Sequence, residues 1–381
     1  MVKDAFDVSL YFHLPFCKRK CDYCHFYVIP DNALFKKKLS ASLRIEWDRR
    51  APELQDRQIS SIYFGGGTPT LFGPDLIHDI LARIGKGPPR SHCDREITLE
   101  ANPEDVTLAL MQSYAQAGIN RVSIGIQSLD PQLLTLLSRR HSVKQAKEAV
   151  MLTHKAGFNN ISVDLMYDLP EQTLSSWKKT LSDVKPLPIT HLSLYNLVIE
   201  PHTVFHKKKK TLASQLPDPS TSVEMYTHAI ETLNSVGFIH YEISAFQRNN
   251  SYSRHNAGYW TGRPFLGFGP SAFSYWKGKR SRNIAHLGRY HSLLTAGKSP
   301  IDFEEELPEP SKRRELLAIH LRLLQGVEIE IFEGRHGPLD EETKTTIKQL
   351  EEDGLLEQID KHLRLTKKGI LFYDTVASEI I

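Results

Sequence analysis

The hydrophobic pattern of the first half of the chain alternates between short β-rich runs and longer amphipathic runs. Period-two or apolar runs predict strands at six places, residues 8–14, 60–64, 96–100, 121–126, 160–165 and 191–195. Helical periodicity follows the first five strands, over residues 31–50, 74–84, 105–117, 131–138 with 143–156, and up to about 184. Strands that alternate with helices predict a parallel sheet with right-handed crossovers. We therefore expect an α/β fold built on a partial (β/α)6 barrel over residues 1–200.

Beyond residue 200 this rhythm breaks. A helix is predicted over 221–236 and a strand over 240–244. The Gly- and aromatic-rich segment 249–275 reads as a long functional loop within an extension over 201–307. Residues 308–381 form a third unit, with helices over 311–324 and 341–352 and two strands with a turn over 355–357 and 362–369. This order predicts a small winged-helix-like α+β domain. No strongly basic recognition helix is present, so a structural or substrate-covering role is favoured over DNA binding.

A cysteine loop follows the first predicted strand. Cys17, Cys21 and Cys24 are three of the four cysteines of the chain, and Cys93 is expected to be structural or superficial. One short loop can bring three thiolates round an iron–sulfur cluster. Three ligands leave one iron of a four-iron cluster open, as a catalytic metal centre requires. The alternatives are a zinc site that takes His13 or His25 as fourth ligand, and three thiols without a metal.

Composition narrows the class of protein. Apolar residues make up 40% and charged residues 24% of the chain, as in ordinary globular proteins. A net charge of +3 gives no reason to expect nucleic acid, and the lysine run 207–210 is more typical of a solvated loop than of a phosphate site. Few cysteines, no apolar run of membrane-spanning length and no export signal predict a reducing, cytoplasmic setting.

Polar and glycine residues gather after the predicted strands, at the end of a parallel barrel that carries chemistry. They are the glycine run 65–67 with Thr68, then Glu100, Gln127, Arg139 and Asp164. Successive glycines let backbone groups approach a ligand closely. Carboxylates suit an amine or ribose hydroxyls, and arginine can meet a carboxylate with two hydrogen bonds. A plain tight turn, helix caps and surface charges are the alternatives.

The C-x3-C-x2-C loop resembles that of the radical S-adenosylmethionine (SAM) superfamily. Wider motifs are similar to those of the oxygen-independent coproporphyrinogen III oxidase family, from residue 8 into the C-terminal unit. They are Tyr-Phe-His-Leu-Pro-Phe-Cys at 11–17, Gly-Gly-Gly-Thr-Pro-Thr at 65–70, Glu-Ala-Asn-Pro at 100–103, Ser-Ile-Gly-Ile-Gln at 123–127, Val-Asp-Leu-Met-Tyr-Asp-Leu-Pro at 163–170 and Glu-Pro-His-Thr at 200–203. The resemblance implies a 4Fe-4S cluster on Cys17, Cys21 and Cys24, whose fourth iron binds SAM.

The same resemblance implies further site residues. The SAM contacts of the family fall on Tyr11, Tyr23, Gly66, Gly67, Thr68, Glu100, Gln127, Arg139 and Asp164. Tyr23 stands where members often have Phe, and some of these positions belong to a second SAM site in the oxidases.

At two markers the chain resembles the haem chaperone (HemW-type) branch of this family. True oxidases carry a fourth cysteine where this chain has Phe26, and the segment 255–260 matches the branch motif H-N-x-x-Y-W. His255 is then the expected axial ligand of haem, and Tyr259 and Trp260 offer flat apolar surface. The alternative is that His255 and Asn256 only hydrogen-bond this segment to the barrel.

The resemblance implies a protein that binds haem as cargo and delivers it to an acceptor such as a respiratory membrane protein. It would be cytoplasmic and peripheral at the membrane during delivery. An electron donor such as flavodoxin or ferredoxin is expected as a partner, and nucleic acid is not. One alternative is a coproporphyrinogen III oxidase that forms protoporphyrinogen IX by radical decarboxylation, an activity that we do not expect. Another is a structural protein with a relict cluster. Whether the chain is an enzyme at all stays open at this point.

Overall fold

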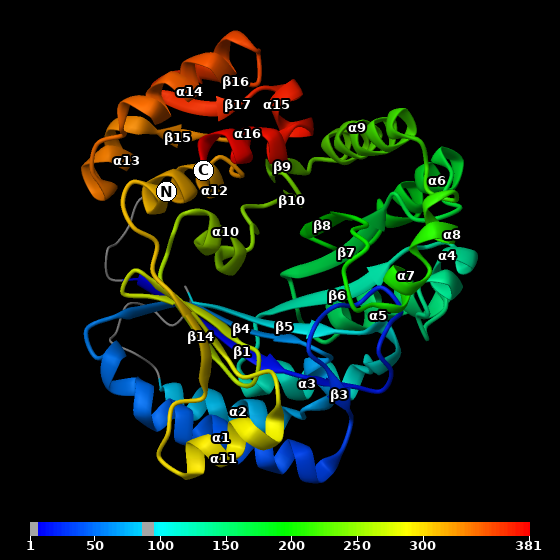
Figure 1. Cartoon of the computed structure of the whole chain (residues 1–381). Coiled ribbons are helices and arrows are strands. Elements are labelled where there is room, and N and C mark those ends of the chain that lie inside the picture. Colours follow the sequence, from blue (N-terminus) through cyan, green and yellow to red (C-terminus); the bar gives the residue numbers. More distant parts are fainter. Residues whose placement is uncertain (1–6, 86–94) are drawn as a thin grey trace.

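A twisted central sheet organises the computed structural model, which describes residues 7–85 and 95–381 and so does not describe Cys93. Among its parallel strands within the described residues, six neighbours follow one another in the order of the chain. In spatial order they are β1 (Asp7–Leu14), β4 (Gln58–Gly66), β5 (Glu96–Ala101), β6 (Arg121–Gln127), β7 (Ile161–Tyr167) and β8 (His191–Asn196). This arrangement confirms the predicted partial (β/α)6 barrel (Figure 1).

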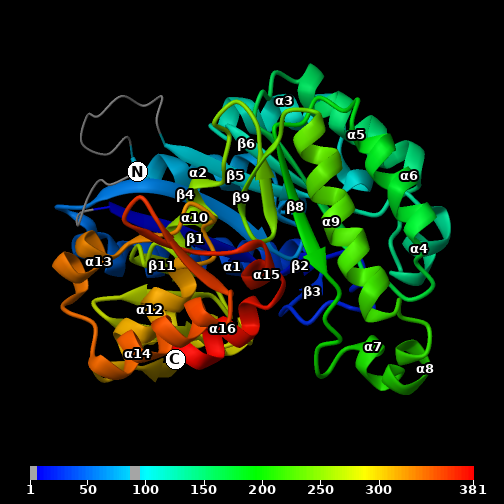
Figure 2. The same ribbon diagram turned by 90° about the horizontal axis from the view of Figure 1, so that it is seen from above.

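Helices cover the outer face of these strands, as Figure 2 shows from above. They are α1 (Ala33–Arg50), α2 (Pro74–Ile84), α3 (Leu108–Ala117), α4 (Pro131–Leu136), α5 (Val143–Lys155), α6 (Leu174–Val184) and α9 (Pro219–Ser235). Local signals set their bounds: Ser142 and Thr173 form capping boxes at the starts of α5 and α6, and Gly118 ends α3 with a positive φ of 107°.

The sheet extends at both edges, up to twelve strands within the described residues. Beside β1 lie β11 (Phe265–Phe268), which is parallel to it, and then the antiparallel strands β12 (Phe273–Trp276), β13 (Lys279–Asn283) and β14 (Ile301–Glu305). Beside β8 lie the antiparallel strands β10 (Ala245–Gln247) and β9 (Ile239–Glu242). The extension over 201–307, with α11 (Leu287–Thr295), therefore shares one hydrophobic core with the barrel.

Two sequence expectations are wrong in this region. Residues 249–275 are not one long loop, because they hold α10 (Arg254–Trp260), β11 and β12. β11 was missed in the sequence because Gly267 interrupts its pattern. A Cβ on Gly267 would lie 2.0 Å from the carbonyl oxygen of Phe273, so a side chain at this position would prevent β12 from packing so closely. The lysine run 207–210 is also no loop, since it spans α7 (Val204–Lys207) and α8 (Lys209–Ala213).

The C-terminal unit has its own hydrophobic core. Its elements are α12 (Ser311–His320), β15 (Val327–Glu328), α13 (Ile329–His336), α14 (Glu341–Glu352), β16 (Leu356–Ile359), β17 (His362–Leu365), α15 (Lys367–Leu371) and α16 (Tyr373–Ile380). The strand predicted to run to 369 ends at Leu365, because Thr366 caps α15 by accepting the N–H of Gly369 at 2.9 Å.

Figure 1 shows this unit, in orange and red, stacked over α10. The Arg322 guanidinium lies 4.4 Å from the ring centroid of Trp260 in α10 and 5.2 Å from that of Tyr373, and it pairs with Glu242 at 2.6 Å. These contacts fasten the C-terminal unit to the barrel. No helix among the described residues is long and apolar enough to cross a bilayer.

Candidate cluster and cofactor site

The cysteine loop leaves β1 at the carboxyl end of the barrel. It is held at its base by a short parallel pair, β2 (Phe16–Cys17) with β3 (Ile29–Pro30), and by a turn in which Cys24 N donates to Cys21 O at 3.2 Å. All three cysteines are free and half-buried. Phe205 N in α7 donates to Asp22 O at 3.0 Å, and the rings of Phe205 and Tyr23 pack edge to face. The loop is thus fixed on both sides with its thiols near the surface.

The surroundings of the thiols suit a metal group that is bound by thiolates. Thr68 Oγ1 lies 3.5 Å from Cys17 Sγ, and Arg139 Nη1 donates to Cys21 Sγ at 3.5 Å. Burial raises the pKa of Cys17 to about 11 and raises that of Cys24. Bound metal favours thiolates that burial alone would keep protonated. Within the described residues the buried Arg139 Nε has no hydrogen-bond partner, which leaves a donor for an anionic ligand atom.

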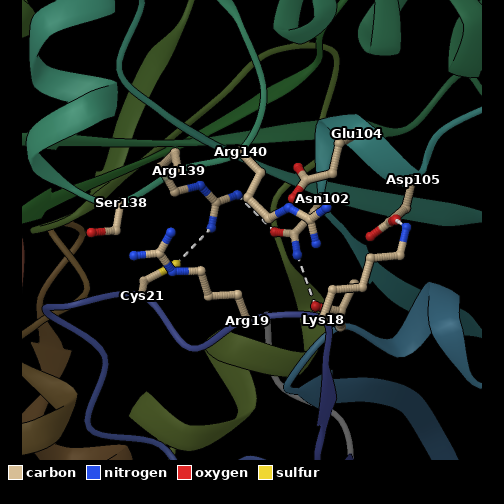
Figure 3. Close-up of a pocket in the computed structure, with 10 residues that line it drawn as sticks. Lys18, Arg19, Cys21, Asn102, Glu104, Asp105, Ser138, Arg139 and Arg140 are labelled. Carbon is tan, nitrogen blue, oxygen red and sulfur yellow. Dashed lines mark hydrogen bonds and ion pairs between the residues drawn. The ribbon is translucent and has the colours of Figure 1, made fainter. Parts of the chain in front are cut away.

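Arg139 joins the cysteine loop to two strand ends. Its Nη2 donates at 2.7 Å to both Asn102 Oδ1 and Gly125 O, and Asn102 Nδ2 donates to Thr68 Oγ1 at 2.8 Å. Figure 3 shows Arg139 between Cys21 and Asn102, at the edge of a small cavity. Asn102 was given no role from the sequence. The period-two alternation of β5 puts it on the same side as Glu100, and that signal could have found it.

The glycine turn after β4 is packed too tightly for side chains. A Cβ on Gly66, whose φ is 110°, would lie 2.5 Å from the His13 ring, and one on Gly67 would lie 2.7 Å from Phe16 O. His13 is braced in turn by Tyr11 OH at 3.1 Å and by Tyr27 O at 2.9 Å. The register of β1 and β4 pairs Leu14 with Gly66, so the turn lies beside the start of the cysteine loop.

Two carboxylates face the inside of the barrel below this turn. Glu100 accepts Tyr63 OH at 2.8 Å and Gly66 N at 3.1 Å, and burial, with a smaller effect of the Asp164 charge, raises the pKa of Glu100 to about 7. Asp164 accepts a long hydrogen bond from Ser123 Oγ, at 3.3 Å, and another from Ser193, and burial raises its pKa. Both carboxylates therefore favour a ligand that brings hydrogen-bond donors or a positive charge. Tyr63 is a further contact that sequence reasoning missed.

Gln127 lies at a β-bulge beside Arg139. Its φ of 68° is unusual for a residue with a side chain, and the pairing of β6 with β7 shifts between Gly125 and Gln127. A Cβ on Gly125 would meet Gln127 Nε2 at 2.9 Å. Strained backbone of this kind is concentrated at functional sites.

The tyrosines expected at the SAM site lie apart. The ring of Tyr11 stacks on Tyr63 inside the barrel, with centroids 6.1 Å apart. Tyr23 instead packs into an apolar cluster with Phe205 and Leu133, beside the Arg139 guanidinium.

The expected haem residues lie deeper in the barrel. His255 is 1% exposed, its Nδ1 is 2.9 Å from Ser61 Oγ, and its Nε2 is 2.9 Å from Tyr259 OH. Burial, aided by the Arg263 and Arg121 charges, lowers the pKa of His255 to about 3, so the ring is neutral. Its ring lies 4.8 Å from that of Tyr63, which links it to Glu100. Trp260, by contrast, faces Arg322 of the C-terminal unit.

Similar proteins place the chain in a family. The chain matches the radical SAM superfamily over residues 11–184 and the HemN C-terminal domain over residues 307–372. It is 30% identical to the heme chaperone HemW of Bacillus subtilis over 97% of both chains. It is 31% identical to that of Haemophilus influenzae over 96% of this chain and 95% of the relative. It is 33% identical to the mitochondrial radical S-adenosyl methionine domain-containing protein 1 of Danio rerio, over 85% of this chain and 72% of the relative.

A solved structure shows the same fold. The coproporphyrinogen III oxidase HemN of Escherichia coli, a radical SAM enzyme, superposes with a TM-score of 0.84 at 23% identity, over 98% of this chain and 89% of the enzyme. This likeness concerns the fold, whereas the two bacterial HemW relatives extend over nearly the whole sequence. The chain belongs to the radical SAM superfamily and, within it, to the HemW family.

Proposed function

We propose that this chain is a haem chaperone, which binds haem and a SAM-ligated 4Fe-4S cluster and delivers the haem to an acceptor such as a respiratory membrane protein. The observation that carries the proposal is the near full-length similarity to proteins named heme chaperone HemW. The proposed setting is the cytoplasm, with peripheral contact to the membrane during delivery. An electron donor of the flavodoxin or ferredoxin type completes the proposed partners.

Cys17, Cys21 and Cys24 are the proposed ligands of the cluster. A cluster with an open iron supplies a site for the amino and carboxylate groups of SAM and a source of one electron. The chain itself would bind and orient the cofactor. The Arg139 guanidinium lies against Cys21 and offsets negative charge, and the N–H of Gly66 orients Glu100. The proposed SAM contacts are Tyr11, Tyr23, Gly66, Gly67, Thr68, Glu100, Gln127, Arg139 and Asp164.

His255 is the proposed axial ligand of haem, with Tyr259 and Trp260 as apolar surface. Its neutral ring is in the form that binds iron, but Nε2 has to leave Tyr259 OH first. Ligation by His255 therefore requires a rearrangement of α10, and the competing role is to tie α10 to β4 through Ser61.

Anaerobic purification and a haem titration test the proposal. We expect the absorption of a 4Fe-4S cluster, and then a Soret band that saturates at about one haem per chain. The Cys21→Ala variant, refolded or purified in the same way, separates haem binding from cluster binding. A chain that fails to bind haem at micromolar concentration would contradict the proposal.

A coproporphyrinogen III oxidase is the second candidate, because the fold is that of the Escherichia coli enzyme. Phe26 argues against it, since it stands where the oxidases are expected to carry a fourth cysteine. Incubation with SAM, a reductant and coproporphyrinogen III, followed by detection of protoporphyrinogen IX, decides between the two. Product formed at a catalytic rate would replace the chaperone proposal.

A further inference from the structure

Basic side chains lie within the cysteine loop and on two other segments beside it. We call this set the basic rim: Lys18, Arg19, Lys20, Arg140, Lys207, Lys208, Lys209 and Lys210. All eight side chains are exposed. Figure 3 shows Lys18, Arg19 and Arg140 round the cavity at Cys21. The hydrogen bond from Phe205 to Asp22 places α7 and the lysines after it against the other side of the loop, and Figures 1 and 2 agree.

The rim is rich in uncompensated charge. Lys18 pairs with Asp105, and none of the other seven cations forms an ion pair within residues 7–85 and 95–381. Three acidic groups lie beside these cations: Asp105 is paired with Lys18, Asp22 is half-buried in the loop, and Glu104 lies 3.4 Å from His141. The whole chain carries a net charge of only +3, so this concentration of cations distinguishes one face of the molecule.

The lysines of α7 and α8 are held in place by their own helices. Thr203 caps α7 at His206 N, and Phe205 and Leu212 bury their side chains in the apolar cluster that also contains Leu169. Four consecutive lysines repel one another and add nothing to this packing. A rigid scaffold that presents a self-repelling run beside a metal site is better explained by a negatively charged partner than by stability.

Few exposed apolar side chains lie among these cations. Phe26, next but one to Cys24, is 53% exposed, and its ring is tilted against that of His25, with centroids 4.5 Å apart. Within residues 17–26, 138–140 and 203–213, all of which the structure describes, the exposed large apolar side chains are Phe26 and Val204. A charged surface with two exposed apolar side chains matches a weak, transient protein interface, and it offers little to insert into a bilayer.

We propose that the basic rim is the docking surface for a small acidic electron-transfer protein of the flavodoxin or ferredoxin type. The inference rests on the proposed function, because it assigns the electron donor of that function to this surface. The half-buried thiols lie at the centre of the rim, so a carrier docked there is brought close to the cluster. Attraction between opposite charges would speed encounter and orient the carrier.

The test measures how tightly a purified acidic flavodoxin binds the cluster-loaded chain. Quenching of flavin fluorescence reports the binding, at low and at high salt. The rim variant is K207Q/K208Q/K209Q/K210Q. The matched control is K344Q/K348Q/K361Q/K367Q, which removes four exposed lysines from the C-terminal unit. We expect at least about tenfold weaker binding for the rim variant at low salt, unchanged binding for the control, and a difference that shrinks at high salt because exposed charges are screened.

A haem titration of the same variants separates this proposal from the proposed function, because both should bind haem as the unaltered chain does. Equal flavodoxin affinities of the rim and control variants would overturn the docking proposal, and so would no flavodoxin binding by the unaltered chain. Vesicles of phosphatidylcholine with phosphatidylglycerol test a membrane role. If only the rim variant loses vesicle binding while its flavodoxin affinity is unchanged, the rim binds lipid and the docking proposal is overturned.

Discussion

Replacing Tyr259 by phenylalanine tests whether His255 holds haem iron. The Tyr259 hydroxyl is 2.9 Å from His255 Nε2, the atom that iron would need. A hydrogen bond of this kind contributes about 1 kcal/mol net. Iron that binds Nε2 has to displace this hydrogen bond. Tyr259→Phe removes that cost, and about 1 kcal/mol corresponds to about fivefold stronger haem binding, since 1.4 kcal/mol is a factor of ten. The free energy of unfolding of the haem-free chain should fall by about 1 kcal/mol.

Haem titration followed at the Soret band measures the affinity, and urea denaturation measures the stability. Tyr226→Phe is the matched control, because its hydroxyl lies 3.4 Å from His240 Nε2 and thus forms another tyrosine–histidine pair. We expect this variant to keep the haem affinity. His255→Ala should lose the axial ligand and its spectrum. Because the pKa of His255 is already lowered to about 3, the affinity should show no step near pH 6.5.

An unchanged affinity in Tyr259→Phe, together with an unaltered spectrum in His255→Ala, would refute ligation by His255. The second role would then stand: His255 would be a positioning residue that ties α10 to β4. In that case His255→Ala should lower stability by about 3 kcal/mol without any effect on haem, because Tyr259 OH and Ser61 Oγ lose a buried partner and a cavity opens.

Three further predictions concern the cluster, the cofactor and acid stability. Cys21→Ala should lose the cluster, because two thiolates do not hold it, and an unchanged iron content would contradict the assignment. Arg139→Lys should weaken SAM binding by about tenfold in equilibrium dialysis, because lysine cannot reach Cys21, Asn102 and Gly125 together; wild-type affinity would remove Arg139 from the site. Burial lowers the pKa of His240 to about 4. Below pH 6.5 the unfolded chain therefore binds a proton at this residue more readily than the folded chain does, and the free energy of unfolding falls between pH 6.5 and about pH 4. His240→Gln should reduce that fall by up to about 3 kcal/mol in urea denaturation, and an identical pH profile would contradict the shift.

Much of the barrel could be predicted because its signals are local. Each strand of the barrel is an apolar or alternating run, and the helices start at capping residues such as Ser142 and Thr173. The cysteine loop and the glycine turn are also local patterns. Since the carboxyl ends of parallel strands share one edge, their presence after neighbouring strands was enough to predict that they meet.

The prediction failed where glycine or a charged run obscured the pattern. Gly267 interrupts β11, and its reason is a contact with Phe273 of the next strand, which no periodicity reveals. The lysine run 207–210 looks like a solvated loop until Phe205 and Leu212 are seen to anchor its helices. Asn102 gains its role through Thr68 and Arg139, which lie 34 and 37 positions away along the chain.

The order of residues alone thus specifies the βα repeat, the three-thiol loop and the glycine turn, because hydrophobic period, turn chemistry and ligand spacing act between near neighbours. Only the tertiary structure places the basic run of α7 and α8 against the cysteine loop, brings Arg139 to Cys21, and buries His255 with both ring nitrogens engaged. Apart from the pair of His255 and Tyr259 within α10, these contacts join residues from 118 to 194 positions apart, and they depend on how whole elements pack. Packing is decided by the sum of many small contacts, which no short stretch of sequence contains.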